Sequence, residues 1–317
     1  MLDNFIFSVN VVLPIFVVMF LGFAIRSRGM VDATTLRKVN NIVFYVALPI
    51  MLFRDLSVAN FSEIFDLELV LFSCIMTILI FLGCWAYAHF FIKSDKAKSA
   101  FVQAAFRGNY AIVGLPIVMN VMGAGYSGRA IIIITFVVPI YNVLSVCVLC
   151  YYNGQKLGGI KFVKQTLIHI LKNPIILGIL AGLPFSIFGW ALPQVLRTSV
   201  QYVGGMGLPL ALIVIGGNVD LKSFQSKVSA SFTATFAKLI LAPAIFVPIA
   251  VMLGITGENL LIIYVVSSTP AAINCYIMAE AMDSDTVLTA NIIVLSTFLS
   301  VFTFTLGVFT FKTFGLI

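Results

Sequence analysis

The sequence predicts an all-α polytopic membrane protein in which ten transmembrane helices form two inverted five-helix repeats. Three observations predict this fold class. Of the 317 residues, 61% are hydrophobic and only 10% are charged, with a mean hydropathy of +1.11, whereas a soluble domain carries about 25% charged residues. The apolar residues form long runs separated by short loops. Two of these runs, one in each half, are interrupted at their centres by glycine or proline.

Ten apolar runs account for most of the chain. A transmembrane helix needs about 20 mostly apolar residues, and the loops between the runs leave no room for a soluble domain. The predicted spans are residues 5–25, 36–54, 67–92, 97–122, 129–152, 172–190, 199–219, 228–253, 258–282 and 285–311.

Lysines and arginines gather in the loops on one side of the predicted membrane. The positive-inside rule makes that side cytoplasmic, so we expect a multi-pass protein of the cell membrane with both termini outside. The predicted cytoplasmic loops hold Arg26, Arg28, Arg37, Lys38, Lys93, Lys96, Lys98, Lys156, Lys161, Lys164, Lys172, Lys222 and Lys227, and the outer loops hold Arg54, Arg129, Arg197 and Lys312.

The chain is expected to divide into a first repeat, residues 1–157, and a second, inverted repeat, residues 158–317. Five spans is an odd number, so the second repeat enters the membrane from the opposite face, as in many secondary transporters. A shift of 160 positions aligns residues that mark special backbone, namely Pro14 with Pro174, Gly22 with Gly182, and Leu48-Pro49 with Leu208-Pro209.

The fourth and ninth spans are predicted to be broken helices that cross near the membrane centre. In the fourth, the helix is expected to loosen at Gly114 and to restart with Pro116. In the ninth, Thr269 is expected to cap, and Pro270 to start, the second half-helix. Irregular backbone at membrane depth survives only where protein or a cavity covers it. The helix N-termini at the two breaks would attract an anion.

Two basic residues lie inside predicted spans. Arg107 is about 15 Å deep at 1.5 Å per residue, and Lys238 lies at a similar depth. A charge there costs at least about 2.5–3.5 kcal/mol on insertion scales. Two interpretations stay open for each: it binds the negative charge of a substrate, or it makes a structural ion pair, with Glu280 or with a helix C-terminus.

Polar side chains near the breaks are further candidates for substrate binding. Asn109 and Asn274 offer both hydrogen-bond donors and acceptors, although asparagine also joins helices to one another. Ser268 and Thr269 either contact substrate or bond only to backbone carbonyls. Glu280 either couples transport to an ion or is an interfacial side chain. Asn142 and Asn291 are interpreted as residues that hydrogen-bond between helices.

Other functional classes lack the residues that they need. An intramembrane enzyme requires paired aspartates, a Ser–His pair or a histidine-rich metal set inside the spans, but the chain has two histidines and its acidic residues cluster in loops. The five cysteines lie in apolar runs without zinc-site spacing. No basic stripe on a soluble domain indicates nucleic-acid binding. We therefore expect no catalytic residues, metal or cofactor.

Four stretches resemble the auxin efflux carrier superfamily, and specifically its bacterial malate and malonate permease-like members. The likeness runs over essentially the whole chain. The stretches are Phe44-Tyr45-Val46-Ala47-Leu48-Pro49, Gly108-Asn109 with Gly114-Leu115-Pro116, Ala237-Lys238-Leu239-Ile240-Leu241-Ala242-Pro243, and Thr269-Pro270-Ala271-Ala272.

This resemblance implies ten spans and two inverted halves, with a scaffold part and a transport part interleaved between the repeats and crossed broken helices in the transport part. It also implies secondary transport of small organic anions. The positions that match family motifs are Asn109, Gly114, Pro116, Lys238 and Pro270. Arg107 matches no motif, so its candidacy depends on its depth alone. The chain lacks the long hydrophilic loop of the plant auxin carriers, which favours a bacterial carrier of the inner membrane and argues against auxin as substrate.

The sequence hypothesis is a carrier for a small carboxylate that works by alternating access, with the substrate bound where the broken helices cross. The alternative is a membrane receptor or sensor that binds a small anion without moving it. The expected partners are a small organic anion and membrane lipid, with a homodimer as the expected assembly. Proton coupling, sodium coupling and uniport stay open.

Overall fold

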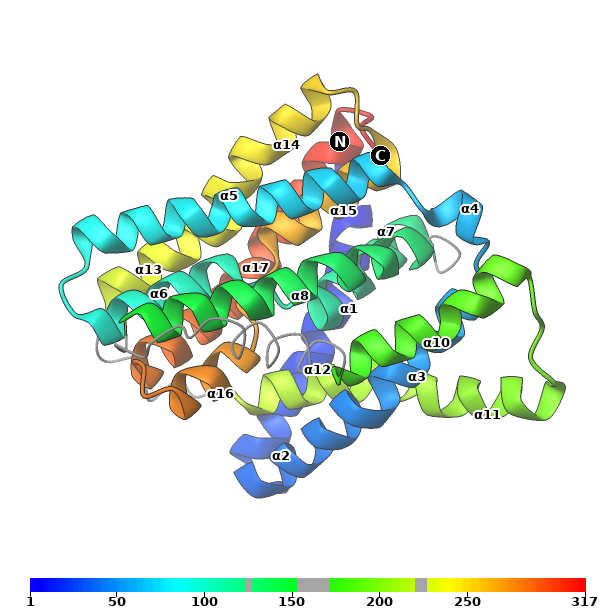
Figure 1. Cartoon of the computed structure of the whole chain (residues 1–317), viewed down its shortest axis with the longest axis horizontal. Coiled ribbons are helices and arrows are strands. Elements are labelled where there is room, and N and C mark those ends of the chain that lie inside the picture. Colours follow the sequence, from blue (N-terminus) through cyan, green and yellow to red (C-terminus); the bar gives the residue numbers. More distant parts are fainter. Residues whose placement is uncertain (124–126, 153–171, 220–226) are drawn as a thin grey trace.

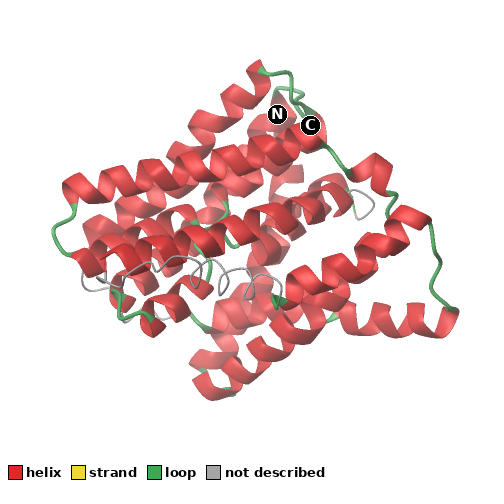
Figure 2. Cartoon of the chain, viewed as in Figure 1, coloured by secondary structure: helices red, strands yellow, loops and turns green. Residues whose placement is uncertain are grey.

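A computed structural model describes residues 1–123, 127–152, 172–219 and 227–317. Within these ranges the chain consists of helices joined by short loops, without a β-strand (Figures 1 and 2). The predicted boundary between the two repeats lies outside the described residues. So do four of the lysines that are predicted to be cytoplasmic, at positions 156, 161, 164 and 222. The predicted all-α class is confirmed.

The helices follow the predicted apolar runs closely. Their bounds are α1 Leu2–Ser27, α2 Ala33–Ile42, α3 Leu48–Ser57, α4 Phe61–Ile64, α5 Leu67–Phe91, α6 Asp95–Phe106, α7 Leu115–Met122, α8 Ser127–Tyr152, α10 Pro174–Phe188, α11 Gln194–Gly205, α12 Gly207–Gly217, α13 Val228–Phe236, α14 Ala242–Met252, α15 Gly257–Ser268, α16 Asn274–Ala281 and α17 Thr286–Thr313.

Seven helical segments in the described part of the chain are long and apolar enough to cross a membrane. Three of them are compound, because α2 continues into α3, α11 into α12, and α13 into α14. The remaining predicted spans are shorter or interrupted. Residues 97–122 form α6 and α7, residues 172–190 form the 15-residue α10, and residues 258–282 form α15 and α16.

In the described part of the chain, three wide helical turns precede prolines inside helical segments. The chain adopts π-helical geometry over Val43–Ala47, Tyr110–Gly114 and Ala237–Leu241, and in each case a proline follows two residues later, at Pro49, Pro116 and Pro243. A proline cannot donate the backbone hydrogen bond of a regular helix and its ring clashes with the preceding turn. A local π-helical turn makes room for the ring. These prolines therefore change the pitch of their helices without ending them.

The helices form two groups, each with members from both halves of the chain (Figure 1). In the first group, α1 packs along α12 and α10 packs along α3, with α2 and α11 alongside. The second group contains α5, α6, α7, α8 and α13 to α17. Both termini lie close together (Figure 1), where Asn4 Nδ2 donates to Thr313 Oγ1 at 3.4 Å. Which side of the membrane they face stays a prediction.

Glycines let the paired helices of the first group touch backbone to backbone. A Cβ atom on Gly216 of α12 would lie 1.7 Å from the carbonyl oxygen of Met19 in α1, and one on Gly178 of α10 would lie 2.4 Å from that of Pro49. Membrane helices associate through such close packing of small residues, because lipid supplies no hydrophobic drive between them.

We expect Gly216→Ala to destabilise the protein by at least about 1–3 kcal/mol, because the added methyl group meets immovable backbone. The measurement is the melting temperature of the purified protein in detergent. Gly205→Ala is the matched control, since a Cβ atom there would meet nothing within 4 Å. Equal melting temperatures for the two variants would contradict this account of the packing.

Candidate functional site

Two interrupted segments cross one another and complete each other's backbone hydrogen bonding. The chain is extended from Arg107 to Asn109, between α6 and the π-helical turn that leads into α7, and again between α15 and α16. Gly108 and Ala271 form an antiparallel bridge. The Asn109 N–H donates to the Pro270 carbonyl at 2.8 Å, and the Ala272 N–H donates to the Arg107 carbonyl at 3.2 Å. We call this arrangement, residues 107–109 and 269–273, the crossover.

A side chain supplies a further bond to the crossover, and a glycine makes it possible. The Ala271 N–H donates to Ser296 Oγ of α17 at 3.0 Å. A Cβ atom on Gly108 would lie 2.2 Å from Thr269 Oγ1 and 3.1 Å from Lys238 Nζ. The two extended strands can therefore approach this closely only because Gly108 has no side chain.

The predicted positions of the two interruptions are wrong by several residues. Gly114 and Pro116 lie in continuous helical backbone, and the break lies earlier, at Arg107–Asn109. The π-helical turn Tyr110–Gly114 accommodates Pro116, so the helix does not have to restart there. In the ninth segment Thr269 is the C-terminal cap of α15, Pro270 lies in the extended stretch, and α16 begins at Asn274. The pairing partner across the crossover, not proline, fixes where each helix stops.

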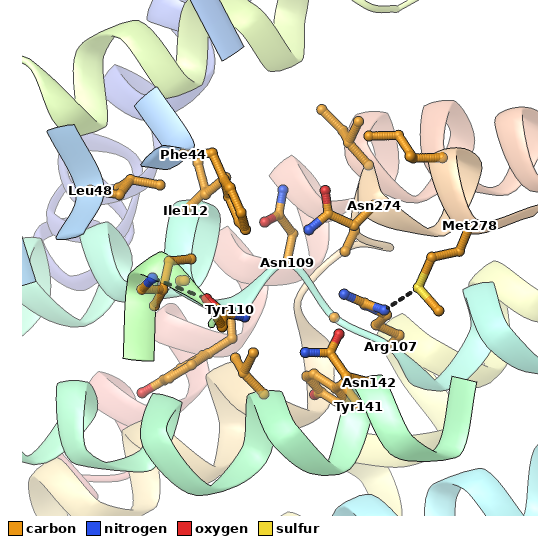
Figure 3. Close-up of a pocket in the computed structure, with 18 of the residues that line it drawn as sticks. Phe44, Leu48, Arg107, Asn109, Tyr110, Ile112, Tyr141, Asn142, Asn274 and Met278 are labelled. Carbon is orange, nitrogen blue, oxygen red and sulfur yellow. Dashed lines mark hydrogen bonds between the residues drawn. The ribbon is translucent and has the colours of Figure 1, made fainter. Parts of the chain in front are cut away.

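A cavity of about 230 Å³ lies at the crossover, between the two helix groups (Figure 3). The first group contributes residues of α2, α3, the intervening π-helical turn and α10. The second group contributes α8, α16, the crossover and the π-helical turn Tyr110–Gly114 that follows it. The lining residues are Asn40, Val43, Phe44, Leu48, Arg107, Gly108, Asn109, Tyr110, Ala111, Ile112, Val138, Tyr141, Asn142, Asn173, Ile175, Ala272, Ile273, Asn274, Ile277 and Met278.

Arg107 is a buried cation in this pocket without an ion-pair partner among the described residues. Its side chain is 6% exposed, and Nη1 lies 2.9 Å from the thioether sulfur of Met278 (Figure 3). A thioether is a weak acceptor, whereas a guanidinium has five N–H donors. Of the interpretations left open by the sequence, the structural ion pair with Glu280 is wrong, because the exposed Glu280 makes no such pair.

Asparagine amides surround the guanidinium. Figure 3 shows the side chains of Asn109 and Asn274 next to one another, and Asn142 on α8 below Arg107. The side-chain amides of Asn40, Asn109, Asn142 and Asn274 make no hydrogen bond to the described residues, whereas Asn173 Oδ1 accepts from the Ile175 N–H and caps α10. The pocket therefore combines one cation with several uncommitted neutral donors and acceptors.

Lys238, unlike Arg107, is hydrogen-bonded to the end of a helix. Its Nζ donates to the Phe106 carbonyl, the last residue of α6, at 2.8 Å, and lies 5.8 Å from the centre of the Tyr141 ring. The side chain is 1% exposed and does not line the pocket. A cation at a helix C-terminus offsets the partial negative charge of the free carbonyls. The structure thus shows the helix C-terminus contact that was one of the two interpretations of Lys238.

Several predicted site residues support the crossover without lining the pocket. Ser268 Oγ donates to the Tyr264 carbonyl at 2.6 Å, and Thr269 Oγ1 to the Val266 carbonyl at 3.4 Å, so both bond within α15. The buried residues Gly114, Pro116 and Pro270 are also absent from the lining. Of the predicted residues, Arg107, Asn109 and Asn274 line the pocket.

Sequence reasoning missed pocket residues on other helices. Asn142 was interpreted as a residue that bonds between helices, but its amide faces the pocket. Asn173 is the N-cap of α10, a position where asparagine is common, and Asn40 lies in the last turn of α2. Phe44 and Met278 resemble the apolar residues of any span. Among these residues, only Asn142 could have been identified from the sequence, because it is a polar residue in the middle of the apolar helix α8.

The chain is similar to membrane transporters over nearly its whole length. A family model described as membrane transport protein matches residues 7–308. An uncharacterized transporter of Methanocaldococcus jannaschii is 25% identical over 303 residues, which cover 91% of this chain and 94% of the relative. The uncharacterized transporter YfdV of Escherichia coli K12 is 24% identical, covering 86% and 88%. A Rhizobium meliloti protein named "Putative malonate transporter" is 22% identical, covering 93% of each chain.

We expect Gly108→Ala to lower the melting temperature, because the new methyl group would press on Thr269 Oγ1 and separate the two extended strands. Removing that hydroxyl should relieve part of the clash. The double variant Gly108→Ala/Thr269→Ala is therefore expected to melt at a higher temperature than Gly108→Ala alone. A double variant that melts lower still, by the sum of the two single effects, would show that the strands do not touch here.

Proposed function

Because the chain belongs to the membrane transport protein family, whose model matches residues 7–308, we propose that it is a secondary carrier that moves a small carboxylate across the membrane by alternating access. The single observation that carries the proposal is the buried Arg107 guanidinium, which faces a cavity at the crossover and lacks an ion-pair partner among the described residues. A charge inside the membrane costs free energy, and a residue that carries one is by default a candidate for a functional site.

Helix ends add to the attraction for an anion. The helical backbone that leads into α7 begins at Tyr110, and α16 begins at Asn274, both in the lining of the pocket. The first turn of a helix has free N–H groups and the positive end of the helix dipole. The two C-terminal ends at the crossover belong to α6 and α15, and Lys238 contacts the α6 end. In α16 the N–H groups of Cys275 and Tyr276 already donate to the Ala272 and Ile273 carbonyls, so the attraction there comes mainly from the helix dipole.

The size of the pocket supports a small substrate. Sites for drug-sized ligands occupy about 300–1,000 Å³, and this cavity has about 230 Å³. Its remaining walls are apolar, with Phe44, Leu48 and Ile112 on the opposite side from Arg107 and Met278 (Figure 3). A short organic chain that carries a carboxylate matches both features.

The position of the pocket supports alternating access. It lies between two helix groups, so a shift of one group against the other would change the side to which it opens. Asn40 and Asn173 both line the pocket, and each lies shortly after a segment rich in lysine and arginine. By the positive-inside rule those segments lie on the cytoplasmic side. We therefore interpret the observed conformation as open toward the cytoplasm.

The ten-span topology and the inverted repeat belong to the same proposal. The pairing of α1 with α12 and of α10 with α3 joins elements of the first half to elements of the second in two similar contacts. Two interruptions at corresponding places in the halves are typical of inverted-repeat transporters. A bacterial inner-membrane location with both termini outside, and a homodimer, stay predictions.

Glu280 does not support ion coupling at this site. It is exposed and lies outside the pocket lining. The alternative of a receptor or sensor is not favoured, because the family and the relatives described above are transporters. An enzymatic function is not favoured for the same reason.

We expect Arg107→Ala to reduce carboxylate uptake by reconstituted proteoliposomes by about 30-fold or more, because truncating one partner of a buried charge pair costs about 2–5 kcal/mol. Asn109→Ala removes a neutral hydrogen bond worth about 0.5–1.5 kcal/mol, so a loss of about 3-fold to 10-fold is expected. Both variants should keep the wild-type melting temperature within a few degrees.

Arg197→Ala is the control, because this exposed arginine of α11 lies outside the pocket and should leave uptake unchanged. Normal uptake by both Arg107→Ala and Asn109→Ala would contradict the assignment of the site. Anion binding to wild-type protein without any counterflow would favour the receptor alternative.

A further inference from the structure

The pocket has a restricted inventory of charges. Among the described residues that line it, Arg107 is the one with a permanent charge, and none of them is an aspartate, glutamate, histidine or lysine. The polar side chains that accompany it near the guanidinium are the asparagine amides of Asn109, Asn142 and Asn274 (Figure 3). The single positive charge of Arg107 can therefore neutralise one ionised carboxylate group of a ligand.

Lys238 does not supply a second contact for an anion. Its Nζ is bonded to the Phe106 carbonyl, at a helix end that carries partial negative charge. It lies behind Gly108, where a Cβ atom would approach Nζ to 3.1 Å, and it is absent from the pocket lining. Lys238 could therefore act on a ligand in the pocket only by long-range electrostatic attraction across the crossover backbone, and not by a hydrogen bond.

The amides next to Arg107 suit an uncharged polar group. An ionised carboxylate only accepts hydrogen bonds, whereas a protonated carboxyl group, a hydroxyl or an amide both donates and accepts. Asn109 and Asn274 lie side by side with uncommitted amides that also do both (Figure 3). A second carboxylate placed there would be buried without a cation, and a buried group in that situation takes up a proton instead.

We propose that the pocket selects singly charged anions, with one ionised carboxylate on Arg107 and one uncharged polar group on Asn109 and Asn274. This inference rests on the proposed transport function. A dicarboxylate would bind after one carboxylate group has taken a proton from water, and it would release that proton on the other side. Each cycle then moves one proton on the substrate and a net charge of −1, so coupling needs no carboxyl group of the protein.

The experiment compares each dicarboxylate with its monoamide, which is a singly charged anion at every pH used. The pairs are oxalate and oxamate, malonate and malonamate, and succinate and succinamate. Full-length protein in proteoliposomes is assayed by counterflow between pH 5 and pH 8, with equal pH on both sides, and the apparent KM is measured for each compound.

For a carried pair, the apparent KM of the monoamide is expected to stay constant. That of the dicarboxylate should rise about tenfold for each pH unit above its second pKa, because the singly charged fraction falls by that factor. A dicarboxylate KM that stays constant or falls as pH rises, with the monoamide excluded, would overturn the inference and leave the proposed function standing. If wild-type protein carries none of the six compounds and none raises its melting temperature, the proposed function fails as well.

A second cation in the pocket provides an independent check. Asn274→Lys should remove the pH dependence of the dicarboxylate KM and raise the monoamide KM about tenfold or more. Asn218→Lys adds the same charge at an exposed position outside the pocket and should change neither. An Asn274→Lys protein that folds but keeps the wild-type pH dependence would overturn the inference. If that variant does not fold, the wild-type KM comparison decides alone.

Discussion

The structure depends on one constraint, namely that backbone N–H and C=O groups far from water must find partners within the protein. Two helices can stop inside the bundle here because each supplies the partners that the other lacks. The bonds between Asn109 and Pro270 and between Arg107 and Ala272 do for the crossover what the regular helix bond does elsewhere. The helical segments that begin after the paired residues start at Tyr110 and Asn274, and the pocket lies where these two starts come together.

The neighbours of the crossover follow from the same constraint. Ser296 satisfies the Ala271 N–H, which the pairing leaves over, and Lys238 satisfies the end of α6. Gly108 permits the approach of the two strands. Arg107 is different, because its guanidinium is buried next to a thioether and faces a cavity. The structure thus distinguishes a cation bonded to a helix end from a cation that faces a cavity, although the sequence predicts a similar depth for both.

Composition and hydrophobic runs were sufficient to predict the helical class, the positions of the helices and the two segments that are interrupted. They could not locate the interruptions, because a proline such as Pro116 can be accommodated by a π-helical turn, whereas the break at Gly108 depends on a partner 163 residues away in sequence, at Ala271. Depth in the membrane identified Arg107 and Lys238, but only the fold distinguishes their roles. Asn142 was missed because packing, not sequence, decides which face of α8 meets the cavity.

The most direct test is an experimental structure of the protein in lipid nanodiscs with a short carboxylate, oxamate for example, at saturating concentration. The account predicts two helices that end at residues 106 and 268, paired extended strands between Gly108 and Ala271, and the carboxylate within hydrogen-bond distance of the Arg107 guanidinium. Two helices that run unbroken through the bilayer, or a carboxylate bound away from Arg107, would contradict it.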